Sequence, residues 1–178
     1  MKQKYFLQSV KLFPHIIALF VSLLATETQA ATFVVNSVGD AADFNTADNI
    51  CETATAGECT LRAAIEQANA TAGTDAIEFS IAPFDSVVKT IAPAIALPNI
   101  TQAVTIDGYT QPLSMANTNP TTMGINAVLL IELNGAGAGA DGLRLLNGGS
   151  TVRGGQHHRL AEKRCGRFGQ HRRGHQFD

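Results

Sequence analysis

Short apolar segments with the alternation of β-strands recur along the chain, separated by turn residues. They lie at residues 32–36, 76–81, 87–91, 103–107, 128–133 and 142–146. Glycine, asparagine, proline and aspartate fill the intervals, as they do between the strands of all-β proteins. From about residue 91 onward the strands recur every roughly 15 to 25 residues, and regular hairpin turns are scarce. This pattern favours a solenoid of stacked coils, with a β-sandwich as the competing fold.

The segment after Cys59 has helical periodicity instead. Thr60 is placed to cap a helix of about ten residues that ends near Asn69 and Gly73. The apolar face of this helix is formed by Leu61, Ala64, Ile65 and Ala68. The polar residues expected to face outward are Arg62, Glu66 and Gln67. Because so short a helix is marginal in water, we expect it to dock on a larger core as a lid.

Two cysteines, Cys51 and Cys59, flank a short loop of small residues just before this helix. In an oxidising compartment such a pair forms a disulfide. A zinc site is the alternative, but the spacing is unusual for zinc ligands and neither a nearby histidine nor a second cysteine pair is present. The sequence therefore predicts a Cys51–Cys59 disulfide, with Cys165 left over.

The amino-terminal segment, residues 1–30, has the three-part pattern of a signal peptide. Lysines at positions 2, 4 and 11 precede a mostly apolar run at 12–25, and small residues follow at Thr28 and Ala30. The apolar run is shorter than the roughly 20 residues that span a bilayer. We therefore predict export, with cleavage between Ala30 and Ala31, and a secreted, cell-surface or outer-membrane location.

Charge excludes one class of partner. Between residues 31 and 154 the chain has four basic residues against twelve acidic ones, a net charge of −8. Nucleic-acid phosphates require a basic face, so we predict no nucleic-acid partner. The length after cleavage suits one domain with a real core. No later segment is long and apolar enough to cross a membrane, so we expect no stable transmembrane segment.

The segment 59–70 resembles the Cys-Ser-Leu-Arg-Glu-Ala-Ile signature of the CSLREA domain. As in that family, a strand of the Thr-Phe-Val-Val-Asn-Ser type and an acidic loop with the first cysteine precede it. Residues 104–112, 126–133 and 142–154 resemble the opening coils of right-handed parallel β-helices that follow this domain. Ala63 stands where the family has glutamate, so the reciprocal half of a capping box is missing. The resemblance implies a pectin-lyase-like bacterial surface or secreted protein.

The carboxyl-terminal stretch, residues 155–178, departs from this pattern. It holds four of the five histidines and six of the thirteen basic residues, and strand periodicity vanishes. We interpret it as a disordered basic tail produced by a frameshift near Gly154, which makes the chain a truncated fragment. Cys165, His171 and His175 have a spacing similar to that of metal ligands, but a site needs four ligands and a scaffold.

The glycine-rich run at 135–140 loosely matches a dinucleotide-binding pattern. That pattern requires a helix immediately afterward, and the following Asp-Gly and Asn-Gly-Gly pairs oppose one. Residues 137–143 approximate one calcium-binding turn of a motif that works only in tandem copies. We therefore predict a flexible turn here, without cofactor or metal.

An enzyme on this scaffold would place carboxylates and a basic residue on adjacent coils. The candidates are Asp107, Glu132, Asp141, Arg144 and Arg153. Each also suits a turn or a strand surface, so we predict no catalytic residue.

We expect an all-β chain with one short capping helix: a signal peptide (1–30), an amino-terminal cap (31–90), about three β-helix coils (91–154) and the tail (155–178). The favoured function is a non-catalytic, adhesin-like or polymorphic outer-membrane-like module that binds carbohydrate or cell surfaces. The alternative is a fragment of a pectin-lyase-like polysaccharide lyase or hydrolase. An open end of the β-helix is also expected to promote self-association.

Overall fold

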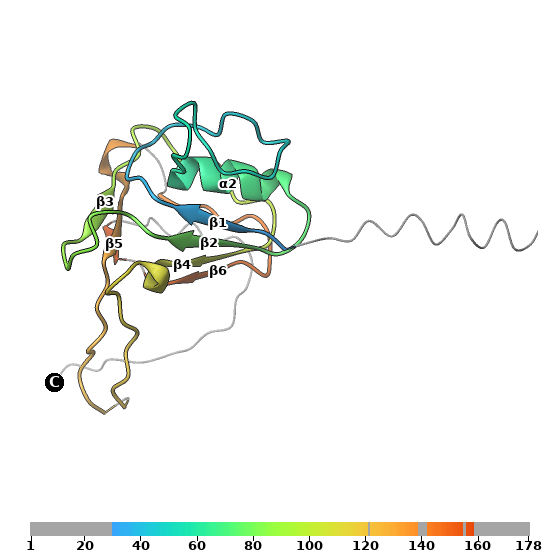
Figure 1. Ribbon diagram of the computed structural model, residues 1–178. Helices are drawn as coiled ribbons and strands as arrows, with labels where there is room; N and C mark the ends of the chain where they lie inside the picture. Colours follow the sequence, from blue (N-terminus) through green and yellow to red (C-terminus); the bar gives the residue numbers. More distant parts are fainter. Residues whose placement is uncertain (1–29, 121, 139–141, 155, 159–178) are drawn as a thin grey trace, which may run out of the picture.

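The first five strands bury alternate residues, as the sequence pattern predicts. A computed structural model describes residues 30–120, 122–138, 142–154 and 156–158 (Figure 1). This part of the chain is mainly β with one α-helix, and no helix in it is long and apolar enough to cross a membrane. The elements are β1 (Thr32–Val35), α2 (Leu61–Ala70), β2 (Asp75–Phe79), β3 (Lys89–Ile91), β4 (Val104–Asp107), β5 (Ile131–Asn134), β6 (Thr151–Arg153) and β7 (Gln156–His158), with the 3-10 turns η2 (Gly108–Thr110) and η3 (Gly135–Gly137).

The strands form two parallel sheets, and from β2 onward the chain alternates between them. One sheet has the order β1-β2-β4-β6, and the other has the order β3-β5-β7. In the first sheet Phe33 pairs with Ile77, Ile77 with Ile106 and Ile106 with Val152, so inward-facing apolar residues are stacked on one another. In the second sheet Ile91 pairs with Leu133. The core lies between these apolar rows.

Helix α2 covers the start of the first sheet. It contacts β1 and β2, and the segment 36–58, which we name the cap loop, lies on its opposite side (Figure 1). Leu61, Ala64, Ile65 and Ala68 are all buried in the core cluster. The helix therefore lies inside the fold, between the sheet and the cap loop.

Side chains extend the first sheet beyond the end of β4. The chain leaves the sheet at η2, but Phe79 N still donates to Thr110 Oγ1 (2.7 Å). Ile81 N donates to Gln111 Oε1 (2.8 Å), and Gln111 Nε2 donates to Ile81 O (2.9 Å). The buried Gln111 amide thus replaces a strand backbone, which satisfies polar groups that would otherwise be buried without partners.

Two segment predictions were wrong. Residues 142–146 form no strand; within this segment Leu145 makes one parallel bridge, to Ile100. Conversely, Gln156–His158 forms β7 beside β5, although we predicted a disordered tail from residue 155. The remainder of that predicted tail and the signal peptide up to residue 29 lie outside the described residues.

Candidate functional site

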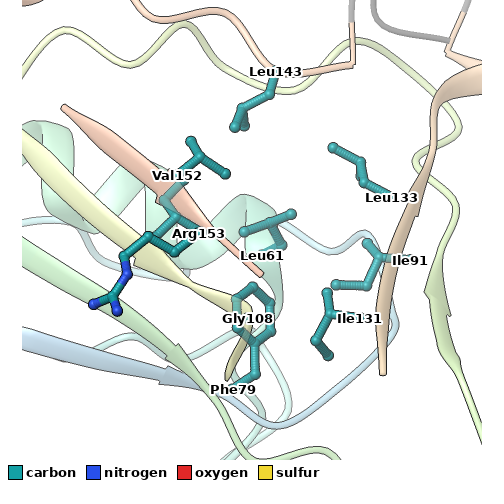
Figure 2. A pocket seen from close by; sticks show the side chains of 10 residues that line it. Leu61, Phe79, Ile91, Gly108, Ile131, Leu133, Leu143, Val152 and Arg153 are labelled. Carbon is teal, nitrogen blue, oxygen red and sulfur yellow. The ribbon is translucent and has the colours of Figure 1, made fainter. Parts of the chain in front are cut away.

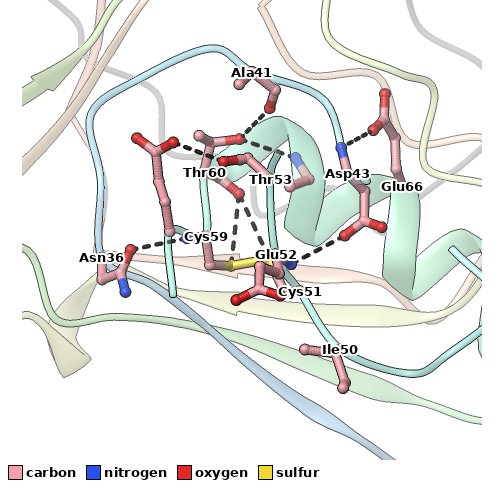
Figure 3. Close-up of a disulfide and its surroundings, with 12 residues drawn as sticks. Asn36, Ala41, Asp43, Ile50, Cys51, Glu52, Thr53, Cys59, Thr60 and Glu66 are labelled. Carbon is pink, nitrogen blue, oxygen red and sulfur yellow. Dashed lines mark hydrogen bonds between the residues drawn. A yellow bond between two sulfur atoms is a disulfide. The ribbon is translucent and has the colours of Figure 1, made fainter. Parts of the chain in front are cut away.

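The predicted disulfide is confirmed and joins the cap loop to the start of α2. Cys51 and Cys59 are bonded, with their Cα atoms 5.3 Å apart (Figure 3). Cys59 is also tied to the chain that follows β1. Its amide donates to Asn36 Oδ1 (2.9 Å), and its carbonyl accepts from the amides of Asn36 and Ser37. One short segment therefore connects the disulfide, the first strand and the helix.

Thr60 caps α2 and binds the cap loop at the same time. Its Oγ1 accepts from Ala63 N (3.1 Å) and donates to Ala41 O (2.6 Å). Both Thr60 and Ala63 are fully buried. A glutamate at position 63 would therefore bring a carboxylate into the interior, and burying an unpaired charge is unfavourable. Alanine at position 63 therefore suits a helix that the cap loop covers closely.

The expectation that the polar side chains of α2 face outward was wrong for two of the three. Arg62 and Gln67 are buried, whereas Glu66 is half-buried. The cap loop covers this polar face: Gln67 Nε2 donates to Thr46 O (3.2 Å), and Glu66 Oε2 accepts from Asp43 N (2.8 Å). Gln67 and Glu66 therefore bind backbone groups of the cap loop.

Arg62 connects three segments. Its Nε lies 2.9 Å from Asp40 Oδ1 and its second terminal nitrogen lies 2.8 Å from the same oxygen. The two terminal nitrogens also donate to the carbonyls of Ala96 and Ile95, each at 3.0 Å. The planar guanidinium suits this task, because it presents several donors in fixed directions. Arg62 thus holds the cap loop and the chain after β3 against the helix.

Glu58 anchors the carboxyl end of the cap loop. Its two carboxylate oxygens accept from Thr53 Oγ1 (2.7 Å) and Ser37 Oγ (2.8 Å). These hydrogen bonds, the one from Thr53 first, lower the pKa of Glu58 below its ordinary value of 4.5.

A Glu58→Gln variant should be less stable than the parent at neutral pH. A folded-state pKa below the unfolded value means that ionised Glu58 stabilises the fold above about pH 4.5. That contribution disappears as the pH falls through the folded-state pKa. The melting temperatures of the parent and of Glu58→Gln should therefore differ at pH 7. They should converge toward pH 3, at about the range where carboxylates titrate. A difference that stays constant with pH would contradict this assignment.

The outer face of the first sheet carries a second cluster of polar side chains. Val34, Glu78, Asp107 and Arg153 occupy successive register positions across β1, β2, β4 and β6. Arg153 and Asp107 form an ion pair at 3.1 Å. Asp107 Oδ1 also accepts from Tyr109 N (3.0 Å), which fixes the turn after β4.

Tyr109 belongs to this cluster, and its ring accounts for the glycine at position 154. Gly154 has a φ of +63°, and a Cβ there would lie 2.6 Å from the Tyr109 ring. A larger residue is therefore excluded both by the backbone conformation and by the tyrosine. The half-exposed ring lies beside the backbone that follows Arg153. We name Glu78, Asp107, Tyr109 and Arg153 the outer-face cluster.

Of the five residues considered for catalysis, the structure brings Asp107 and Arg153 together. Glu132 lies on the second sheet, where it accepts from Thr90 Oγ1 (2.6 Å). Arg144 is exposed, and Asp141 lies outside the described residues. Glu78 was missed, although its place on a strand was predicted, because only the parallel register sets it next to Asp107.

The metal-ligand and glycine-rich motifs of the sequence fall partly outside the described residues. Within them, no three histidine, cysteine, aspartate or glutamate residues are grouped to hold a metal. Cys165, His171 and His175 lie outside the described part. The glycine run begins with the 3-10 turn η3, capped by Asn134 Oδ1, which accepts from Ala136 N (3.1 Å). The run continues into residues 139–141, which the structure does not describe.

A small apolar cavity of about 30 Å³ lies between the two sheets and α2 (Figure 2). Apolar side chains from Leu61, Phe79 and Ile131 point into it, whereas the guanidinium of Arg153 points away. Small-molecule sites usually enclose about 300 to 1,000 Å³. This space is therefore a packing gap in the core, too small for a ligand of that size.

Comparison with protein-family models, with curated proteins and with solved structures finds no match to this chain.

Proposed function

We propose that this chain forms the cap and opening coils of a secreted or cell-surface right-handed parallel β-helix of the CSLREA type, and that it binds carbohydrate without catalysis. The observation that carries the proposal is the path of the chain. From β2 to β7 it alternates between two parallel sheets, and each new strand joins the edge that the previous strand of that sheet left open. This path supports the proposal, because the coils of a solenoid add strands to their sheets in the same order.

The cap supports the same proposal. The end of a solenoid exposes apolar side chains and an unpaired strand, which invite aggregation unless something covers them. Here α2 and the cap loop lie over the first sheet, and a disulfide and Arg62 hold them there. The disulfide also suits an exported chain, because structural disulfides persist in oxidising compartments.

The outer-face cluster is the proposed binding surface. Sugars present hydroxyl groups and apolar ring faces, which match carboxylates, a guanidinium and a half-exposed tyrosine ring. Glu78 and Arg153 have exposed or half-exposed side chains, and Asp107 holds Arg153 in place. Because residues 31–154 carry a net charge of −8, a neutral glycan is favoured over an acidic one.

Binding of the exported protein to an immobilised panel of neutral and acidic glycans tests this function. A Glu78→Gln variant should bind the best neutral glycan about tenfold more weakly, the effect of losing one hydrogen bond to a charged group. The matched control is Glu132→Gln, which removes the same charge from the second sheet and should leave Kd unchanged. Absence of binding to every glycan, or equal loss in both variants, would contradict the proposal.

A polysaccharide lyase or hydrolase is the second candidate, favoured by the Asp107–Arg153 pair on neighbouring strands with Glu78 in register. Incubation with pectin and other polysaccharides, followed by a reducing-end assay, separates the two functions. Product release that stops in Glu78→Gln would favour the enzyme over the binding module.

A further inference from the structure

Asp75 is a buried residue, and one of its two carboxylate oxygens has no hydrogen-bond partner among the described residues. It lies at the start of β2 with a side chain that is 1% exposed. Oδ1 accepts from the backbone nitrogen of Ala31 at 2.8 Å, whereas Oδ2 is buried without a hydrogen-bond partner among the described residues. A buried carboxylate left unpaired is strongly unfavourable, so a positive charge beside this group would stabilise the fold.

The backbone holds Ala31 firmly in front of this carboxylate. The carbonyl of Ala31 accepts from Ala76 N at 2.8 Å, which begins the pairing of β1 with β2. Ala30, the preceding residue, is exposed. The predicted cleavage of the signal peptide falls on the bond between these two alanines. The nitrogen atom that this cleavage would release is therefore the atom that already contacts Asp75.

We propose that cleavage after Ala30 creates an α-ammonium group on Ala31 that forms a buried ion pair with Asp75. In the hydrolysis, catalysed by the signal peptidase of the exporting cell, water adds across the peptide bond. Ala30 leaves with the new carboxylate, and the Ala31 nitrogen becomes an amine that takes up a proton. At neutral pH this group is mostly protonated, because the α-amino pKa is about 8.

The change from an amide to an ammonium at Ala31 matches the positions of the two Asp75 oxygens. A peptide nitrogen offers one N–H donor and no charge, whereas an ammonium offers three donors and a positive charge. One donor keeps the bond to Oδ1, and another becomes available for the unpartnered Oδ2. Processing therefore completes the first turn of the fold, and the precursor is less stable than its product.

Two exported proteins test this proposal. The first is the chain itself, and the second carries one glycine inserted between Ala30 and Ala31. Cleavage after Ala30 then leaves an extra residue, so the nitrogen of Ala31 stays an amide. Intact mass should show a first residue of Ala31 in the parent. The insertion should lower the melting temperature by about 5 °C or more, the effect expected of breaking a buried ion pair in a chain of this size.

The matched control is the same glycine insertion made in an Asp75→Asn variant. Without the carboxylate charge, the inserted glycine should change the melting temperature by less than about 2 °C. Equal melting temperatures for the parent and the insertion, or a parent that begins at another residue, would overturn the proposal. The inference shares with the proposed function only the premise of export. Glycan binding by a protein that begins elsewhere would refute the ion pair and leave the binding proposal standing.

Discussion

Replacement of Arg62 with alanine should lower the free energy of unfolding by about 3 kcal/mol or more, because the Arg62 side chain connects α2 to both the cap loop and the chain after β3. The variant removes the ion pair with Asp40 and the donors to the carbonyls of Ile95 and Ala96. Asp40 is then largely buried without its cation, and the two carbonyls lose partners. The cap loop should separate from α2 before the sheets unfold.

Urea unfolding followed by circular dichroism measures the change in stability, and hydrogen exchange of residues 36–58 reports the cap loop. Arg62→Lys should recover only part of the loss, since an ammonium cannot reproduce the fork of donors. The exposed Arg144→Ala is the matched control and should stay within about 0.5 kcal/mol of the parent. If Arg62→Ala and Arg144→Ala were equally mild, the described network would not hold the cap.

The strands and the helix were predictable because their patterns are local. Alternation identified every strand within residues 32–134, and the ends of α2 followed from Thr60 and the residues near Asn69. The segment 142–146 was wrongly predicted to be a strand. Its leucines have the composition of a strand, but within it only Leu145 forms a β-bridge, to Ile100. Strand β7 was missed because a strand of three residues with polar composition has no periodicity to detect.

The contacts of the helix's polar face could not be predicted, since they depend on a loop. Residues 36–58 have no periodicity, and nothing local indicates that Asp40 and Thr46 fold back over Arg62 and Gln67. The outer-face cluster was missed for a related reason. Glu78, Asp107 and Arg153 belong to three separate strands, and only the parallel register aligns them. Sequence patterns define elements, whereas sites between elements require their pairing.

Loss of the Cys51–Cys59 disulfide should lower the free energy of unfolding by about 2 to 3 kcal/mol. The estimate follows from the entropy of closing a short loop in the unfolded chain. The double variant Cys51→Ser with Cys59→Ser removes the bond, leaves no unpaired thiol and keeps both side chains small. Treatment of the parent with dithiothreitol should reproduce the change, whereas the double serine variant should not respond to the reductant. A parent whose unfolding curve is the same with and without reductant would contradict a stabilising role.

The disulfide and Arg62 should not act independently, because they hold opposite parts of one loop. The bond fixes Cys51 near the end of the cap loop, and Arg62 fixes Asp40 near its beginning. Once the disulfide is absent, the loop opens more readily and the Arg62 contacts contribute less. Arg62→Ala should therefore destabilise the double serine variant by at least about 0.5 kcal/mol less than it destabilises the parent. Strict additivity of the two effects would show instead that the two ends of the cap loop are held separately.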